Sequence, residues 1–236
     1  MMVASKTPAS FEAAAIESPV HSPKGGDAEP LRTPAYWQDA CKHLVKKDRV
    51  MKRLIPQFGN ACLQIRGDAF TTLARSVVGQ QISVKSAQSV WRKFSALPQN
   101  MTPANVLKLK VDDMRAAGLS ARKVEYLVDL ALNFDTGLVH FKSWEAMDDE
   151  SIIAELVAIR GIGRWTAEMF LIFHLMRPNV LPLDDVGLIK GISDNYFSGD
   201  PVSRSDAREV AAAWEPYRSV ATWYIWRSLD PLPVVG

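Results

Sequence analysis

Two adjacent carboxylates, Asp184 and Asp185, stand directly before an apolar helical pattern that includes Leu188 and Ile189. An aspartate at the start of a helix commonly caps it by accepting a backbone N–H. One residue is enough for that task, so the second carboxylate is available for other chemistry. An ionised carboxylate can stabilise positive charge that develops on a substrate. The pair is therefore the first candidate for a catalytic site.

The second candidate site is a Gly-Ile-Gly sequence between two apolar helical segments. Gly161 and Gly163 allow the backbone angles of a tight hairpin, and Ile162 can pack between the two helices. The helix that follows would present free backbone N–H groups and the positive end of its dipole to an anion such as phosphate. An ordinary helical connection with a glycine C-cap is the alternative. We expect a phosphate site that also includes Arg164 and Thr166.

The elements that must position these residues are predicted to be helices. Apolar residues recur at helical spacing from Pro34 onward, and no alternation of period two extends over five residues. Residues 63–65 could form at most one short strand. The fold class is therefore all-α. Helix starts are predicted at Thr102-Pro103, at Ser120, at Asp148 or Asp149, and at Ser205 or Asp206.

The composition is compatible with one large domain or two small lobes. The chain has 236 residues, of which 47% are hydrophobic, and a net charge of +2. Residues 1–30 are rich in Ala, Ser, Pro and Gly and contain few large apolar groups, which predicts a disordered N-terminal tail. The tail carries two basic and four acidic residues, which leaves +4 on the rest. A mildly basic domain is compatible with nucleic acid but does not require it.

The two cysteines, Cys41 and Cys62, match no zinc-binding spacing and cannot supply the four ligands of an iron–sulfur cluster. We expect reduced thiols and no organic cofactor. No apolar run approaches the roughly 20 residues of a membrane span, and the N-terminus lacks the apolar segment of a secretion signal. These features predict a soluble, intracellular protein without a membrane partner.

Several segments, taken in their order and spacing, resemble the helix-hairpin-helix DNA glycosylase superfamily. Within that superfamily, the chain is most similar to the DNA-3-methyladenine glycosylase II branch. The resemblance covers about residues 35–230. Its segments are residues 70–83, 118–127, the hairpin through Ala167, 183–190 and 214–219.

The resemblance implies a glycosylase domain over residues 31–236, made of two helical lobes with the active site in a cleft between them. Lobe one would hold about residues 68–176, and lobe two would combine residues 31–67 with 177–236. The implied activity is hydrolysis of the N-glycosidic bond of alkylated bases, such as 3-methyladenine or 7-methylguanine, in double-stranded DNA. This is a step of base excision repair.

In the family that this sequence resembles, the second acid of the pair is catalytic, and it corresponds to Asp185. Asp184 would then be the helix cap or a residue that supports Asp185. Breaking an N-glycosidic bond builds positive charge at C1′, which a nearby carboxylate stabilises. The sequence leaves open whether Asp185 also activates water. Family members that cut the backbone carry a lysine where Trp165 stands, so no Schiff base is expected and the enzyme is predicted to be monofunctional.

The resemblance also implies a base pocket and a wedge loop. Trp165 and Trp226 match pocket positions, where an aromatic ring attracts a cationic base by about 0.5–2 kcal/mol. Met169 and Val186 stand where aromatic residues can occur in the family, which bears on the substrate range. Residues 80–83 match the wedge loop, in which Gln81 or Ile82 would fill the space of the flipped nucleotide. A polar turn between helices is the alternative for this loop.

A structural cation at the hairpin is implied by the same resemblance, with the backbone carbonyls of Val157, Ile159 and Ile162 as candidate ligands. The protein is expected to be a monomer. It would be cytoplasmic and associated with the nucleoid in a bacterium, or nuclear in a eukaryote.

Two other functions remain in view. A non-catalytic helix-hairpin-helix module could bind DNA without acting on it, but such a module gains nothing from an acid near phosphates. A glycosylase for oxidised or mismatched bases is the second alternative. The absence of the lysine and of the cluster cysteines argues against it.

Overall fold

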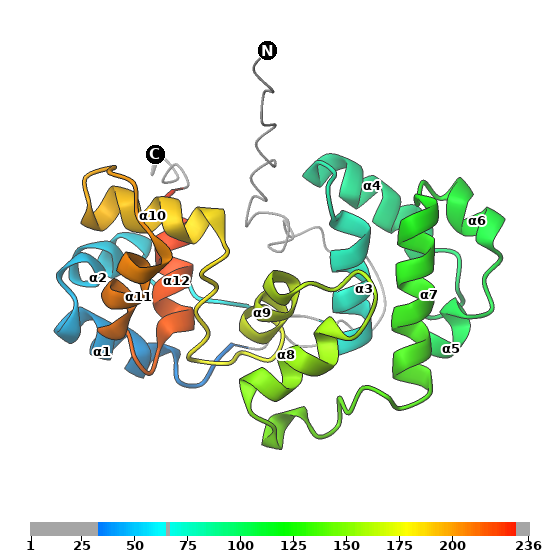
Figure 1. Ribbon diagram of the computed structural model, residues 1–236, viewed down its shortest axis with the longest axis horizontal. Helices are drawn as coiled ribbons and strands as arrows, with labels where there is room; N and C mark the ends of the chain where they lie inside the picture. The colour runs from blue at the N-terminus through cyan, green and yellow to red at the C-terminus, as the bar shows by residue number, and fades with distance from the viewer. Residues whose placement is uncertain (1–32, 65–66, 230–236) are drawn as a thin grey trace, which may run out of the picture.

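The computed structural model describes residues 33–64 and 67–229, and every regular element in these ranges is a helix (Figure 1). The all-α prediction is confirmed, and Leu63 and Gln64 form no strand. The predicted tail, residues 1–30, lies outside the described residues. The helices are α1 (Trp37–Lys47), α2 (Arg49–Leu54), η2 (Ile55–Phe58), α3 (Ala69–Gly79), α4 (Val84–Ser95), α5 (Pro103–Val106), α6 (Val111–Ala116), α7 (Ala121–Asp135), η3 (Trp144–Ala146), α8 (Asp149–Val157), α9 (Arg164–Phe173), α10 (Val186–Tyr196), α11 (Arg204–Ala212) and α12 (Arg218–Arg227).

Side-chain caps explain where several of these helices begin. Thr102, Ser120 and Asp148 each accept the backbone N–H three residues later, as their types predict. The prediction for α11 is wrong, because Ser203 caps it. The reason is a capping box: Asp206 lies inside the helix and accepts the backbone N–H of Ser203.

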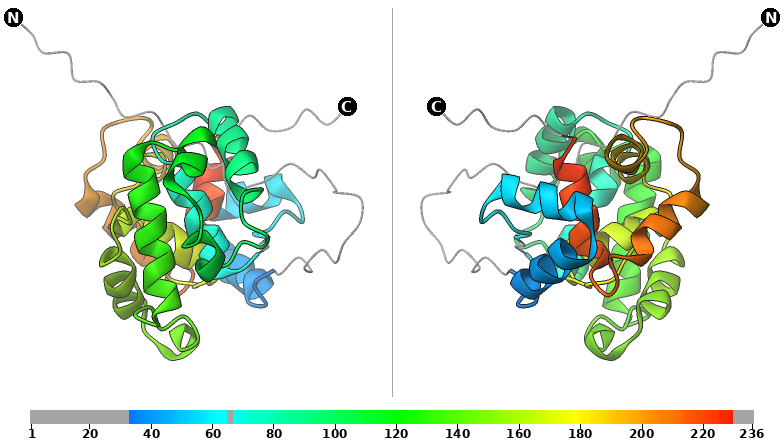
Figure 2. Two further views of the ribbon diagram at one scale, coloured as in Figure 1. Left: turned by 90° about the vertical axis from the view of Figure 1, so that its right-hand side faces the viewer. Right: turned by 90° about the vertical axis from the view of Figure 1, so that its left-hand side faces the viewer.

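The helices form two lobes. In lobe one, α3 packs on α4, α7 and α9, α7 also contacts α5 and α6, and α8 packs on α9. In lobe two, α12 contacts α1, α2 and α10, and α10 contacts α11. Figure 2 (right) shows the blue and cyan N-terminal helices beside the red α12. None of the helices in the described ranges is long and apolar enough to span a membrane.

The segment between α9 and α10 crosses from one lobe to the other and is held by hydrogen bonds to lobe two. Ser219, at the start of α12, donates from its hydroxyl to the carbonyl of Arg177 (2.5 Å) and accepts the N–H of Val180 (3.0 Å). The hydroxyl of Tyr36 donates to the carbonyl of Met176 at 2.6 Å. These contacts fix the course of the chain that ends at the carboxylate pair.

Candidate functional site

Asp185 is the N-cap of α10. Its backbone is extended, and Oδ1 accepts the N–H of Leu188 at 2.6 Å. Of the two roles predicted for Asp184, the helix cap is therefore wrong, and the support of Asp185 stays a prediction. Asp184 lies one residue outside the cap position, is exposed, and forms an ion pair with Arg204. Both aspartates line a surface pocket of about 260 Å³, together with Val186.

Two indole rings hold the carboxylate of Asp185. Trp226 Nε1, on α12 of lobe two, donates to Oδ1 at 2.7 Å, and Trp165 Nε1, on α9 of lobe one, donates to Oδ2 at 2.8 Å. With Leu188, three N–H groups point at the carboxylate, at the positive end of the α10 dipole. A carboxylate has about four acceptor positions, so one remains for a substrate or water. The site is therefore assembled from both lobes.

Gly187 makes room for this arrangement. A Cβ atom at this position would lie 3.1 Å from Asp185 Oδ1 and 3.3 Å from Trp226 Cδ1. Those distances are shorter than ordinary van der Waals contacts between such atoms. A larger residue would therefore push the indole away from the carboxylate.

The aromatic environment of the site differs between its two tryptophans. Trp226 is only 7% exposed, and its ring stacks on Phe173 with centroids 5.6 Å apart. Trp165 is partly buried, and Val186 beside Asp185 is 66% exposed. The role of Trp165 and Trp226 as the base pocket stays a prediction, and Trp165 is the more accessible of the two.

Phe173 is a residue of the site that sequence reasoning missed. It lies on the same face of α9 as Trp165 and Met169, at a spacing of four residues. This spacing is a signal that the sequence contains. The face meets lobe two, because Trp165 contacts Asp185 and Phe173 contacts Trp226.

The hairpin between α8 and α9 requires a glycine at Gly161 but not at Gly163, whose φ of −90° and ψ of 167° any residue adopts. Gly161 has φ of +87°, and a Cβ there would lie 2.2 Å from the ring of Tyr126. Ile162 is buried, as predicted. Gly163 is exposed and extended, is the N-cap of α9, and provides no side-chain cap for its N–H groups. An anion can therefore approach the start of α9, although phosphate binding itself stays a prediction.

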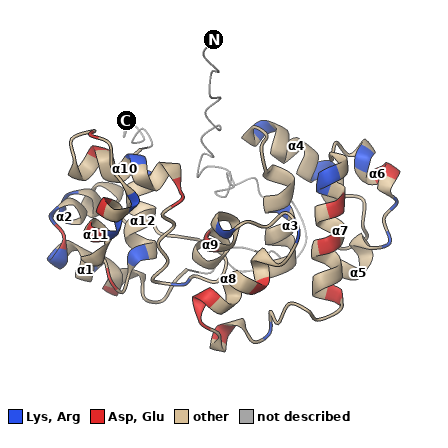
Figure 3. Cartoon of the chain, in the orientation of Figure 1, with Lys and Arg blue, Asp and Glu red and all other residues tan. Residues whose placement is uncertain are grey.

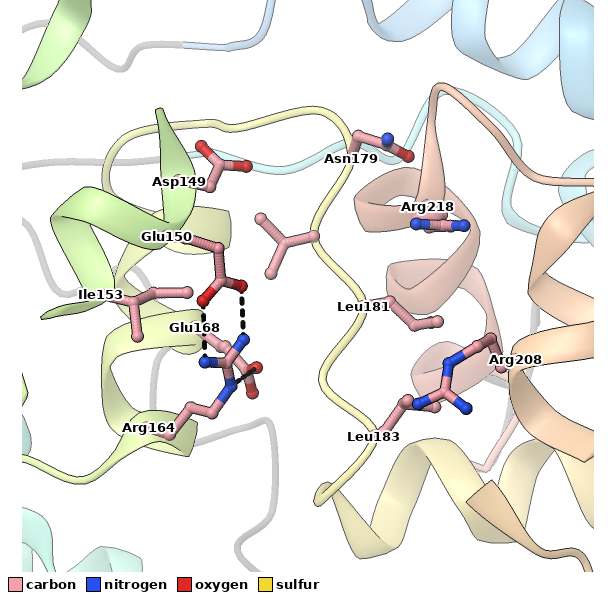
Figure 4. A pocket seen from close by; sticks show the side chains of 11 residues that line it. Asp149, Glu150, Ile153, Arg164, Glu168, Asn179, Leu181, Leu183, Arg208 and Arg218 are labelled. Carbon is pink, nitrogen blue, oxygen red and sulfur yellow. Dashed lines mark hydrogen bonds and ion pairs between the residues drawn. The ribbon is translucent and has the colours of Figure 1, made fainter. Parts of the chain in front are cut away.

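Two of the predicted phosphate contacts are engaged in other ways. Arg164 forms a bidentate ion pair with Glu150 (2.5 and 2.9 Å) and a further one with Glu168 at 3.0 Å (Figure 4). The hydrogen bonds of Glu150 raise the pKa of Arg164, and burial raises the pKa of the Glu168 carboxyl. Thr166 is buried, so its hydroxyl is not exposed to solvent anions. Arg164, Glu150 and Glu168 line a second pocket, of about 240 Å³, to which Asp185 does not belong.

The wedge loop, residues 80–83, connects α3 to α4. Gln81 has a left-handed backbone with φ of +58° and is exposed, and Ile82 is 37% exposed. Both side chains are accessible to DNA, and the choice between them stays open. Gln80, which sequence reasoning did not single out, donates from Nε2 to the carbonyl of Gly161 at 2.9 Å. Basic residues occur on α4 and at the start of α7, the two helices next to this loop and the hairpin contacts (Figure 3).

The candidate cation ligands lie in the same hairpin. The carbonyl of Ile159 accepts the N–H of Ile162 at 3.1 Å, which leaves it one lone pair for a cation. Within the described residues, no group of three His, Cys, Asp or Glu side chains could hold a metal ion. Backbone carbonyls of Val157, Ile159 and Ile162 therefore remain the predicted ligands.

The chain belongs to the HhH-GPD superfamily of base excision DNA repair proteins, whose family model matches residues 74–216. It is 32% identical over 193 residues to DNA-3-methyladenine glycosylase 1 of Schizosaccharomyces pombe, covering 79% of this chain and 85% of that protein. It is 26% identical over 204 residues to a putative DNA-3-methyladenine glycosylase of Bacillus subtilis, covering 82% and 71%. The predicted family is confirmed.

Solved structures of similar proteins have the same fold. The Schizosaccharomyces pombe 3-methyladenine DNA glycosylase in complex with abasic DNA has a TM-score of 0.69 at 31% identity, covering 80% of this chain and 96% of that one. A DNA-3-methyladenine glycosidase from Bacillus halodurans has a TM-score of 0.76 at 30% identity, covering 84% and 92%. An 8-oxoguanine glycosylase/lyase from Clostridium acetobutylicum is 14% identical, and that likeness shows the fold alone.

Proposed function

We propose that this protein is a monofunctional DNA glycosylase that hydrolyses the N-glycosidic bond of alkylated bases in double-stranded DNA. The observation that carries the proposal is the Asp185 carboxylate. Indole N–H groups from both lobes hold it, and one acceptor position remains. Relatives of both bacterial and yeast origin are named DNA-3-methyladenine glycosylases.

The reaction would begin with cleavage of the bond between C1′ and the base nitrogen. The electron pair leaves with the base, so that a cationic alkylated base departs neutral and positive charge develops on the sugar. Asp185 stabilises that charge, because N–H donors from both lobes hold its carboxylate in position. Water then adds to C1′, and its proton passes to the carboxylate or to solvent.

The proposed enzyme does not cut the DNA backbone. Trp165 occupies the position of the lyase lysine, and its indole N–H is bound to Asp185. An indole nitrogen cannot form a Schiff base with the sugar aldehyde. The absence of the lysine also argues against the second candidate, a glycosylase for oxidised or mismatched bases.

The same proposal extends to the DNA partner, the oligomeric state and the subcellular location. The exposed start of α9 would bind a phosphate of the duplex through backbone N–H groups, with Gly161 and Gly163 allowing close approach. A cation held by the hairpin carbonyls would stabilise this turn. We propose a monomer that acts where chromosomal DNA is found, in the cytoplasm of a bacterium or the nucleus of a eukaryote.

The experiment is a single-turnover excision assay on duplexes that each contain one lesion: 3-methyladenine, 7-methylguanine, hypoxanthine or 8-oxoguanine. We expect the two cationic lesions to be released faster than the two neutral ones, because they need no protonation to leave. Borohydride should trap no covalent complex with any duplex. Faster release of 8-oxoguanine, or a trapped complex, would contradict the proposal.

A further inference from the structure

The wedge loop and the hairpin are joined directly, although Gln80 and Gly161 are 81 residues apart in the chain. Gln80 Nε2 donates to the carbonyl of Gly161 at 2.9 Å, and the contact is partly buried. Gly161 is the first glycine of the hairpin, and Gln80 is the residue before Gln81. One hydrogen bond therefore connects the two segments that are expected to contact DNA.

Helix α7 contacts both segments. Lys123 Nζ donates to the carbonyl of Val78 at 2.7 Å, in the last turn of α3 and just before the loop. A helix has no internal donor for its last carbonyls, so this contact satisfies one of them. Burial lowers the pKa of Lys123, which agrees with its partly enclosed position.

The same helix fixes the hairpin. The ring of Tyr126 packs on the backbone of Gly161 so closely that a Cβ would lie 2.2 Å from it. Asp129 Oδ2 accepts the backbone N–H of Arg160 at 2.8 Å, and Glu125 forms an ion pair with the guanidinium of Arg160. Helix α7 therefore contacts both the α3 end of the loop and the hairpin, and the loop and the hairpin also contact each other.

The loop needs such support because of the backbone of Gln81. Its φ of +58° is disfavoured for a residue with a Cβ atom. Such a conformation persists only where surrounding contacts impose it. The residues on either side are fixed: Gln80 is bound to Gly161, and Ser83 caps α4 by accepting the N–H of Ser86.

We propose that Gln80 is a positioning residue that holds the wedge loop in register with the phosphate-binding hairpin, with Lys123 as its support on α7. The inference rests on the proposed function, because it assigns the purpose of the loop to DNA intercalation. A phosphate bound at the hairpin then determines where Gln81 or Ile82 enters the base stack. Neither Gln80 nor Lys123 lines the pocket that contains Asp185.

The test uses the full chain with Gln80→Met, which keeps the side-chain length and removes the donor. Gln57→Met is the matched control, because Gln57 also donates to a backbone carbonyl, that of Arg53 at 3.0 Å, but lies in lobe two. Hydrogen exchange of the loop amides is measured without DNA. Binding to a duplex with 2-aminopurine beside a tetrahydrofuran abasic analogue is followed by fluorescence, which reports unstacking.

We expect the loop amides of Gln80→Met to exchange about 3- to 10-fold faster than those of wild type, which corresponds to the loss of one hydrogen bond. The loop amides of Gln57→Met should exchange at the wild-type rate. The 2-aminopurine signal should fall, while affinity for undamaged duplex stays within about twofold because phosphate contacts are retained. Exchange and fluorescence equal to wild type would overturn the inference.

A second pair of variants keeps the inference testable if Gln80→Met does not fold. Lys123→Met removes the support on α7, and Arg122→Met removes the same charge from the exposed neighbouring position. Only Lys123→Met should accelerate loop exchange, and equal rates in both would overturn the proposal. Exchange in the free protein does not depend on catalysis, so a wild type without excision activity would refute the proposed function separately.

Discussion

Asp48 and Asp185 are both aspartates that cap a helix and accept indole N–H groups, yet their surroundings differ. Asp48, buried in lobe two, accepts four donors: the N–H groups of Val50 and Met51, the hydroxyl of Tyr196 at 2.8 Å and Trp214 Nε1 at 3.2 Å. Asp185 accepts three, and they come from both lobes.

The two carboxylates differ in the number of hydrogen-bond acceptor positions that remain unoccupied. All the acceptor positions of Asp48 are used within one lobe, so its charge stabilises the fold and nothing else. Asp185 retains one position, at a pocket beside the exposed Val186. An aspartate that caps a helix is thus structural when all its acceptor positions are occupied. It is available for chemistry when one of them is left.

The largest expected effect is on catalysis by Asp185→Asn. Asparagine caps a helix about as well as aspartate, so the hydrogen bonds from Leu188 and Trp226 to Oδ1 should be preserved, while the negative charge and the hydrogen bond from Trp165 Nε1 to Oδ2 are lost. We expect the single-turnover excision rate of 7-methylguanine to fall by about 10²-fold or more. An excision rate within fivefold of wild type would show that Asp185 is no more catalytic than Asp48.

The matched change in lobe two, Asp48→Asn, should affect stability instead. The NH2 group that replaces Oδ2 cannot accept the buried indole N–H of Trp214, which would be left with the hydroxyl of Tyr196 as acceptor. We expect the free energy of unfolding to fall by about 2 kcal/mol, measured by urea denaturation. Excision per folded molecule should be unchanged; a large loss of rate without loss of stability would contradict the comparison.

Removing a single indole donor should have an intermediate effect. Trp226→Phe keeps an aromatic ring against Phe173 but deletes the N–H bound to Oδ1 of Asp185. We expect about a tenfold lower excision rate, since one hydrogen bond to a charged group is lost. A variant with the wild-type excision rate would show that Trp226 does not position Asp185.

The smallest effect is expected for Asp184→Asn. Asp184 is exposed and paired with Arg204 on the surface, where ion pairs contribute little. The excision rate should stay within about twofold of wild type. If this variant lost more activity than Asp185→Asn, the catalytic role would belong to the other member of the pair.

Local signals in the sequence determined several features of this protein. Helical periodicity predicts the all-α class, and the caps at Thr102 and Ser120 depend only on residues within one turn. Gly161 was predictable because its left-handed backbone is a local property of the hairpin. The motif order was sufficient to identify the family.

Other features were decided by the tertiary structure, because they depend on residues that are distant in the chain. The sequence cannot show that Arg164 is bound by Glu150, that Phe173 covers a face of Trp226, or that Gln80 reaches Gly161. Which aspartate of the pair caps α10 depends on the residue at which the interlobe segment ends. That segment is fixed by Ser219, 34 residues beyond Asp185, so the geometry of the site follows from the packing of the lobes.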